Sequence, residues 1–243
     1  MRYAILGDIH SNLEAFKAVL KDIEKRSAVD KILCLGDIVG YGPDPTECIH
    51  LLQQYNHICI AGNHDWAAVG NINISDFNPD AAQANYWTSG QITADDKEFL
   101  LRLPQIATET EFTLAHGSPR EPIWEYLLSQ KAAEENFSFF QTKYCIVGHS
   151  HIPLVFERTD DMIIYHEFKN GTALPLRENR LIINPGSVGQ PRDSDPRASY
   201  VLYDSDNSVI FNHRIEYDIS ATQEKMLQKE LPEFLISRLA FGF

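Results

Sequence analysis

Five short blocks of the sequence carry side chains that can bind metal ions, and each block directly follows a run of apolar residues. The blocks are Gly7-Asp8-Ile9-His10, Gly36-Asp37, Gly62-Asn63-His64-Asp65, His116-Gly117 and Gly148-His149-Ser150-His151. Seven of their side chains offer an oxygen or an imidazole nitrogen to a metal: Asp8, His10, Asp37, Asn63, His116, His149 and His151. None of the seven is a cysteine, which argues against a structural zinc site built on thiolates.

Mixed imidazole and oxygen ligands suit Mn²⁺, Fe²⁺, Ni²⁺, Co²⁺ or Zn²⁺, and of these we expect Mn²⁺. Seven ligands are too many for one tetrahedral ion, but they match two divalent ions per chain that share a carboxylate. Asp37 is the sole ligand in its block and is therefore the natural bridge. A metal pair of this kind activates a bridging water and positions the attacking and leaving oxygens of a phosphoryl transfer.

The apolar runs before the blocks predict the strands that must position these ligands. The runs cover residues 3–6, 31–35, 57–60, 112–114 and 145–147. Short apolar runs that end at a glycine are typical of buried strands. In open α/β sheets, ligand sites form beyond the carboxyl ends of the strands. We therefore expect the seven side chains to converge at one edge of a sheet core.

Helices are predicted between the first strands. Ser11 can cap a helix that continues to about Arg26, with Glu14 completing a capping box. A second helix is expected over residues 45–55, where Pro45 suits the first turn. This alternation of strands and helices predicts an α/β protein whose first half is a doubly wound sheet.

The rest of the chain is predicted to complete a single domain over residues 1–243. Residues 66–103 interrupt the alternation with helices over 80–89 and 94–103, and we interpret them as an insertion beside the cleft, either a lid or an ordinary helical connection. Mostly antiparallel strands are expected at 107–108, 112–115, 144–147, 154–157, 162–166, 181–183, 199–203 and 209–214. Helices over 220–230 and 232–240, within the C-terminal stretch 219–243, would pack on the body.

The composition limits the choice of partners. With 21 Lys and Arg against 34 Asp and Glu, the net charge is −13, so nucleic-acid polymers should be repelled and a small phosphate ester is the expected partner. No stretch approaches the roughly 20 apolar residues of a membrane helix, and because a strand is predicted from Tyr3 we expect no signal peptide before it. The four cysteines, Cys34, Cys48, Cys59 and Cys145, are expected to be buried thiols. We expect a cytoplasmic protein; the oligomeric state stays open.

The order of the blocks resembles that of the calcineurin-like metallophosphoesterase superfamily, over about residues 3–193. The resemblance implies a four-layer αββα sandwich of two mixed sheets flanked by helices. It also implies that a metal-bridging hydroxide attacks phosphorus. One metal would be held by Asp8, His10, Asp37 and His151. The other would be held by Asp37, Asn63, His116 and His149. His64 would face the substrate and act with Asp37 in catalysis.

Residues 36–45 and 184–193 resemble a bacterial and archaeal branch of small phosphoesterases, whose members are linked to diadenosine tetraphosphatase or to protein phosphatase. Serine/threonine protein phosphatases carry an Arg after the second and the third block, whereas this chain has Gly40-Tyr41-Gly42 and Trp66-Ala67-Ala68. We therefore favour a phosphodiester or a dinucleoside polyphosphate as substrate. The alternatives are a phosphomonoesterase, including a phosphoprotein phosphatase, and a protein-binding scaffold. Scaffolds of this fold lack the histidine that this chain keeps as His64.

Several further residues could serve either the site or the fold. Arg192 could bind phosphate oxygens or pair with Asp193 or Asp195. Asn12 could contact the substrate, orient His64 or serve its loop, and Tyr41 could stack on a nucleobase or pack in a turn. Asp65 could orient His64 or cap the helix that follows. Trp66, Trp87 and Trp124 could form an apolar substrate wall or pack in the core. The four histidines outside the blocks are expected to be structural: His50, His57, His166 and His213.

Overall fold

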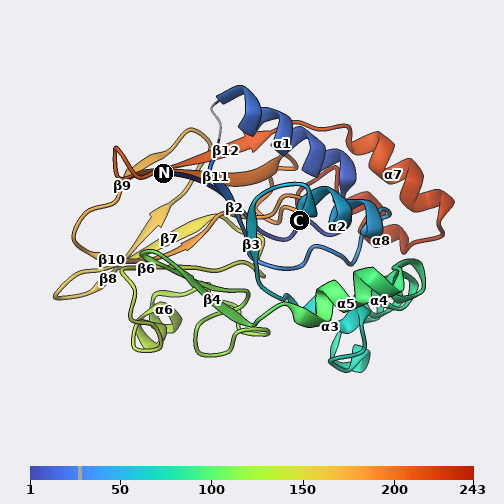
Figure 1. The fold of residues 1–243 in the computed structure, drawn as a ribbon, viewed down its shortest axis with the longest axis horizontal. Coiled ribbons are helices and arrows are strands. Elements are labelled where there is room, and N and C mark those ends of the chain that lie inside the picture. The colour runs from blue at the N-terminus through green and yellow to red at the C-terminus, as the bar shows by residue number, and fades with distance from the viewer. Residues whose placement is uncertain (27–28) are drawn as a thin grey trace.

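The computed structural model describes residues 1–26 and 29–243, whose strands form two six-stranded mixed sheets (Figure 1). The first sheet has the order β3-β2-β1-β11-β12-β9. Its strands are β1 (Arg2–Leu6), β2 (Lys31–Cys34), β3 (His57–Cys59), β9 (Ala173–Pro175), β11 (Ala198–Asp204) and β12 (Val209–Ile215). The strands β1, β2 and β3 are parallel and are joined by α1 (Leu13–Arg26) and α2 (Pro45–Gln53), which confirms the predicted alternation. Both helices pack on the same face of the sheet, so the predicted doubly wound arrangement, with helices on both faces, is wrong.

The second sheet has the order β4-β5-β6-β10-β7-β8. Its strands are β4 (Ile106–Glu109), β5 (Phe112–Ala115), β6 (Tyr144–Ile146), β7 (Leu154–Arg158), β8 (Ile163–Glu167) and β10 (Arg180–Asn184). Most pairs are antiparallel, as predicted, but β6 runs parallel to both β5 and β10. A parallel pair needs a crossover, and α6 (Gln130–Asn136) lies in the connection from β5 to β6. Neither α6 nor β9 was predicted from the sequence.

Four layers follow from the way the side chains alternate along the strands. On β1, Ala4 and Leu6 belong to a core shared with α1 and α2, whereas Tyr3 and Ile5 belong to a core between the two sheets. A third core joins the outer face of the second sheet to α6, through residues such as Phe137. The order is therefore helices, sheet, sheet, helix, which confirms the predicted αββα sandwich (Figure 1).

The start of α1 differs from the prediction. Asn12, and not Ser11, caps this helix, because the Asn12 Oδ1 atom accepts a hydrogen bond from the Ala15 amide at 3.2 Å. Ser11 has φ 52°, a left-handed conformation that does not suit an N-cap residue. Glu14 forms no capping box with Ser11; its carboxylate accepts a hydrogen bond from Lys225 Nζ at 2.8 Å.

Helices fill residues 63–102, between β3 and β4. They are α3 (Asn63–Ala68), the 3₁₀ turn η1 (Ile74–Asp76), α4 (Pro79–Gln91) and α5 (Ala94–Arg102). Side-chain oxygens of Asn78 and Thr93 cap α4 and α5. Two further helices, α7 (Ile219–Gln228) and α8 (Glu233–Arg238), end the chain, and α7 packs against α1. An apolar cluster joins α4, α7 and α8 to Tyr41.

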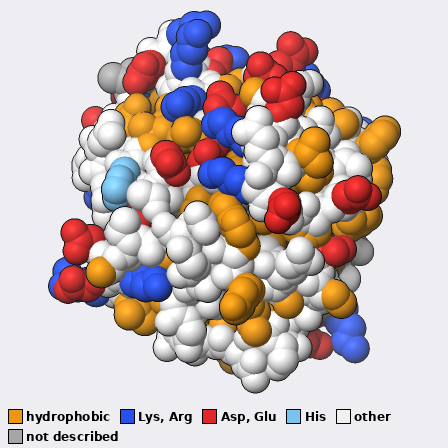
Figure 2. Space-filling model, turned by 90° about the vertical axis from the view of Figure 1, so that its right-hand side faces the viewer, with side chains coloured by type: hydrophobic (Ala, Val, Ile, Leu, Met, Phe, Trp, Pro, Cys, Tyr) orange, Lys and Arg blue, Asp and Glu red, His pale blue; other side chains and the backbone are white. Residues whose placement is uncertain are grey.

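The surface over these last helices mixes all classes of side chain. Figure 2 shows the right-hand face of Figure 1, where acidic, basic and apolar side chains are interspersed. No helix within the described residues is long and apolar enough to cross a membrane. All four cysteines are buried free thiols, as expected.

Candidate metal centre

All five blocks lie where strands end, and the backbone turns sharply there. The blocks follow β1, β2, β3, β5 and β6. Five of the seven predicted ligands have left-handed backbone conformations, with φ between 50° and 63°: Asp8, His10, Asp37, His149 and His151. A non-glycine residue in this region costs roughly 1 kcal/mol. His149 and His151 therefore lie on a turned loop and do not continue the β6 strand.

One group of possible ligand atoms comes from Asp8, His10, Asp37 and His151, all buried and all within 4.8 Å of one another. The His10 and His151 Nε2 atoms are 3.1 Å apart. Each of these rings donates its Nδ1–H to a backbone carbonyl, His10 to Val39 at 3.2 Å and His151 to Gln190 at 2.6 Å. Both Nε2 atoms thus present lone pairs to each other, an arrangement that a cation between them would stabilise.

A second group comes from Asp37, His116 and His149. His116 Nε2 lies 3.3 Å from Asp37 Oδ2 and 3.0 Å from Asn63 Oδ1, and its Nδ1–H is donated to the Leu35 carbonyl at 2.8 Å. Two buried atoms in this group, Asp37 Oδ2 and His149 Nε2, have no hydrogen-bond partner among the described residues. Such atoms fit a metal ion better than they fit an apolar core. Asp37 belongs to both groups, so its carboxylate can bridge two ions.

The ionisation of the ligands favours cation binding. Burial lowers the pKa of His10 and His151 well below the usual value and that of His149 to about 3, so these rings are neutral at pH 7. Burial also acts on His116, but the Asp37 carboxylate outweighs it and raises the pKa of His116 to about 9. The Asp37 carboxylate thus favours positive charge at this place, which a divalent ion would supply.

His64 does not belong to either group of ligand atoms found among the described residues. Its backbone amide donates to Asp37 Oδ1 at 2.8 Å. Its ring packs against the rings of His10, Tyr41 and Phe77, with centroids 4.9, 4.2 and 4.9 Å away. Burial lowers the pKa of His64 to about 4. Its Nδ1 atom lies 3.1 Å from Oδ1 of Asn85, a residue on α4 that the sequence analysis did not single out.

A cavity of about 190 Å³ opens onto the metal-ligand groups. Its lining includes Asp37, Asn63, His64, His149, His151, Tyr41, Arg192, Asp76, Phe77, Asn78, Trp124 and Tyr126. Asp76, Phe77 and Asn78, which belong to residues 66–103, line this cavity. Of the three tryptophans that could form a substrate wall, Trp124 lines the cavity, whereas Trp66 and Trp87 pack against apolar clusters elsewhere.

Arg192 faces this cavity without an acidic partner among the described residues. Its Nη2 atom donates to Gln190 Oε1 at 2.7 Å and to the Tyr41 hydroxyl at 3.3 Å. The acidic neighbours considered as partners are engaged elsewhere, Asp193 with Arg214 and Asp195 with Arg197. The guanidinium and the Tyr41 ring thus form one wall of the cavity.

Two other predicted positions serve the fold. Besides capping α1, the Asn12 side chain donates a hydrogen bond to the Gly189 carbonyl at 2.9 Å and accepts one from the Thr222 hydroxyl at 3.0 Å. Asn12 does not line the cavity beside the metal-ligand groups. These contacts leave it no route to a substrate oxygen or to His64. Asp65 lies inside α3 (Asn63–Ala68) and not before it, so it does not cap a helix that follows; its carboxylate accepts hydrogen bonds from the backbone amides of Gly62 and Val39 and so stabilises the start of α3.

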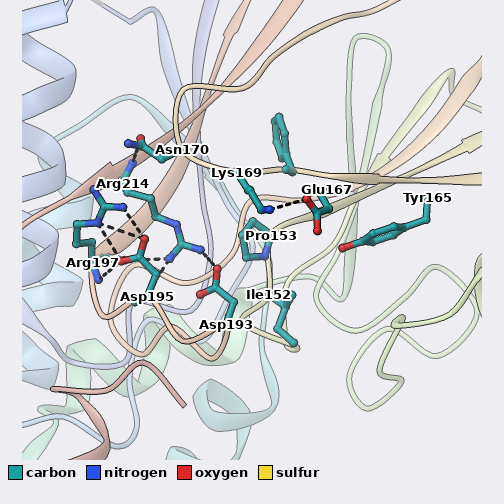
Figure 3. A pocket seen from close by; sticks show the side chains of 11 residues that line it. Ile152, Pro153, Tyr165, Glu167, Lys169, Asn170, Asp193, Asp195, Arg197 and Arg214 are labelled. Carbon is teal, nitrogen blue, oxygen red and sulfur yellow. Dashed lines mark hydrogen bonds and ion pairs between the residues drawn. The ribbon is translucent and has the colours of Figure 1, made fainter.

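A larger cavity, of about 410 Å³, lies next to the loop that follows His151, but its charged groups are mutually paired. Figure 3 shows Arg214 directed at Asp193 and Lys169 directed at Glu167. Because these charges neutralise one another, this cavity offers less to an anionic ligand than the smaller one beside the metal-ligand groups does.

Comparisons with known sequences agree with this geometry. The sequence model of the calcineurin-like phosphoesterase superfamily domain matches residues 1–208. An uncharacterized protein of Methanocaldococcus jannaschii is 41% identical over 244 residues, which span 98% of this chain and 97% of the relative. A symmetrical bis(5'-nucleosyl)-tetraphosphatase of Pseudomonas putida is 32% identical over 103 residues, which span 37% of this chain and 35% of that enzyme.

Comparisons with solved structures extend the likeness to the whole chain. A metallophosphoesterase from Sphaerobacter thermophilus matches with a TM-score of 0.91 and 44% identity, covering 100% of this chain and 99% of that one. A hypothetical protein from Pyrococcus horikoshii matches with a TM-score of 0.83 at 20% identity, covering 100% and 98%. The second likeness concerns the fold alone, because the identity is low.

Proposed function

Because the chain belongs to the calcineurin-like phosphoesterase superfamily, in its branch of small bacterial and archaeal metal-dependent phosphoesterases, we propose that it hydrolyses small phosphate esters at a dinuclear metal centre. The observation that carries this proposal is Asp37, whose carboxylate is common to both groups of ligand atoms. One ion would be held by Asp8, His10, Asp37 and His151, and the other by Asp37, Asn63, His116 and His149. Bound divalent ions would supply an activated water and positive charge for the phosphate oxygens.

Two side chains of the cavity would act on the substrate directly. His64 lines the cavity beside Asp37; burial keeps its ring neutral at pH 7, so it would first take up a proton at the cavity, favoured there by the negative charge of the phosphate ester, and would then hand that proton to the leaving oxygen. The Arg192 guanidinium would bind phosphate oxygens, because its planar fork of donors matches their geometry. Tyr41 would support Arg192, whose guanidinium carbon lies 5.7 Å from the centre of the Tyr41 ring.

Three aromatic side chains at the cavity, which we term the aromatic rim, support a substrate with a flat ring. They are Phe77, Trp124 and Tyr126. The Phe77 and Trp124 rings are 5.1 Å apart, and Tyr126 stacks on the His149 ring at 4.2 Å. Trp124 and Tyr126 remain 37% and 52% exposed, so both can contact a ligand. We therefore favour nucleoside phosphodiesters or dinucleoside polyphosphates, in line with the tetraphosphatase among the relatives.

If the aromatic rim binds a base, the enzyme should prefer nucleoside esters to methyl esters. Trp124→Ala should raise KM for nucleoside esters about tenfold, because a stacked base contributes roughly 1–3 kcal/mol to binding. KM for a methyl phosphodiester should stay near that of the wild type. Tyr86→Ala is a matched control, since Tyr86 is 77% exposed on α4 and does not line this cavity. An equal rise in KM for nucleoside and methyl esters would show that Trp124 does not bind the base.

The test of the proposed function combines metal analysis with a panel of substrates. Purified protein loaded with Mn²⁺ should contain two ions per chain, lose activity on chelation and regain it best with added Mn²⁺. It should be assayed side by side on phosphomonoesters, phosphodiesters, dinucleoside polyphosphates and a phosphopeptide. Full activity with one ion per chain would refute the dinuclear centre, and preference for the phosphopeptide would favour the phosphatase alternative. Absence of hydrolysis on the whole panel would favour the scaffold alternative.

A further inference from the structure

The partner of His64 is unusual because it comes from outside the sequence blocks that build the site. His64 Nδ1 and Asn85 Oδ1 are 3.1 Å apart, and both side chains are buried. Asn85 lies in the middle of α4 (Pro79–Gln91), 21 residues further along the chain. Helix α4 packs against α3, on which His64 sits, so this tertiary contact holds the two side chains together.

Neighbouring residues could not take the place of Asn85. A Cβ atom at Gly40 would lie 2.5 Å from His64 Nδ1, so a side chain at this position would displace the ring. Asp65 follows His64 directly, but its two carboxylate oxygens accept the backbone amides of Val39 and Gly62. The ring is thus accommodated by Gly40 and receives its hydrogen bond from α4.

The contact with His64 explains why a polar residue stands at position 85. The Asn85 side chain is fully buried, and its amide nitrogen has no partner among the described residues. A buried amide that is only half paired destabilises a fold relative to an apolar side chain of the same shape. Asparagine at position 85 therefore costs the fold some stability and in return provides the hydrogen bond to His64.

We propose that Asn85 is a positioning residue that holds His64 as the Nδ1–H tautomer and directs its Nε2 atom to the metal-site cavity. The amide oxygen can only accept, so the proton on Nδ1 stays on the ring and exchange occurs at Nε2. This bond does not involve Nε2, so it fixes the orientation of the ring and leaves Nε2 free to face the cavity. The catalytic part of this inference rests on the proposed function; the tautomer does not.

The first test is spectroscopic and needs no substrate. The sample is ¹⁵N-labelled protein loaded with Zn²⁺, which is diamagnetic. Two-bond ¹H–¹⁵N correlations should show that the His64 ring is protonated at Nδ1. The His64 signals are assigned by their loss in His64→Ala. Asn85→Leu, which removes the acceptor at nearly constant size, should shift His64 toward a mixture of tautomers. A wild-type His64 protonated at Nε2 alone would overturn the proposal, because the amide would then donate to the ring.

The second test is kinetic. Asn85→Leu should lower kcat about 10–100-fold, as loss of an orienting partner usually does, with little change in KM or metal content. Asn85→Asp should recover much of this loss, because it restores an acceptor oxygen at the same place. In the His64→Ala background, Asn85→Leu should have no further effect, since it acts through His64. Independent losses in this double mutant would overturn the proposal.

A control separates positioning from folding. Thr88 is also buried on α4, and its hydroxyl has no partner among the described residues, so Thr88→Val alters the same helix without touching His64. It should keep the wild-type kcat and tautomer. If Thr88→Val lowers kcat as much as Asn85→Leu does, the effect belongs to α4 packing and the proposal fails. If the wild-type protein hydrolyses no phosphate ester, the proposed function fails, whereas the NMR measurement still decides the role of Asn85.

Discussion

Replacing Asp37 with asparagine is expected to strip both metal ions from the protein and to lower kcat/KM by at least about 10³-fold, since several kcal/mol of transition-state stabilisation depend on the ions. The reason is geometric: Asp37 Oδ2 lies 3.6 Å from His10 Nε2 in one ligand group and 3.3 Å from His116 Nε2 in the other. Asparagine can still accept the hydrogen bond from the His64 amide, so the loop should stay folded. Elemental analysis of the purified variant measures the loss.

Variants of the unshared ligands provide the contrast. His10→Asn removes a member of the first group and His116→Asn a member of the second, so each should cost one ion. Thermal unfolding of all three variants shows whether they remain folded. If Asp37→Asn keeps one tightly bound ion and loses the other, Asp37 is not shared and the dinuclear assignment needs revision.

His64→Ala is expected to reduce turnover about 10²–10⁴-fold, the range for loss of a positioned general acid, while both ions are retained. The loss should shrink for esters of acidic phenols, whose leaving oxygen needs little protonation, and stay large for alkyl and nucleoside esters. Steady-state kinetics over a series of leaving groups, with metal content measured in parallel, checks both points. His50→Ala is a matched control, because His50 lies on α2 and does not line the cavity.

The outcome of the His64 experiment distinguishes proton transfer from charge stabilisation, substrate positioning and metal binding. A uniform loss across all leaving groups would assign His64 to charge stabilisation or substrate positioning in place of proton transfer. Loss of an ion would make it a ligand, in conflict with its place outside both groups of ligand atoms. Full activity on every ester would remove His64 from the mechanism.

The parts of the site that could be predicted from the sequence are those governed by local rules. A buried strand that ends at glycine places the next polar residues at the edge of a sheet, and this rule predicts that Asp37 meets Asp8 in one group of ligand atoms and His116 in the other. The left-handed turns at Asp8 and Asp37 are not visible in the residue types, because they are imposed by the strand ends and by neighbouring loops.

The parts that could not be predicted depend on contacts between distant segments. The hydrogen bond from Thr222 to Asn12 joins residues 210 positions apart, and the contact of Asn85 with His64 exists only because α4 packs on α3. Helix α6 is a different case, since Ser129 is a good N-cap that accepts a hydrogen bond from the Ala132 amide and could have been noticed. The three-residue edge strand β9 contains Pro175 and has no alternating pattern to mark it.

The five left-handed ligands have a consequence for attempts to improve this protein in the laboratory. In protein without bound metal, glycine at Asp8, His10, Asp37, His149 or His151 would relieve roughly 1 kcal/mol of backbone strain while removing a ligand. Random mutagenesis can therefore produce several single substitutions that make the protein more stable but inactive. A screen that rewards survival of heat alone would collect them, because stability and activity are opposed at these positions. Directed evolution of a thermostable form must therefore score turnover in every round.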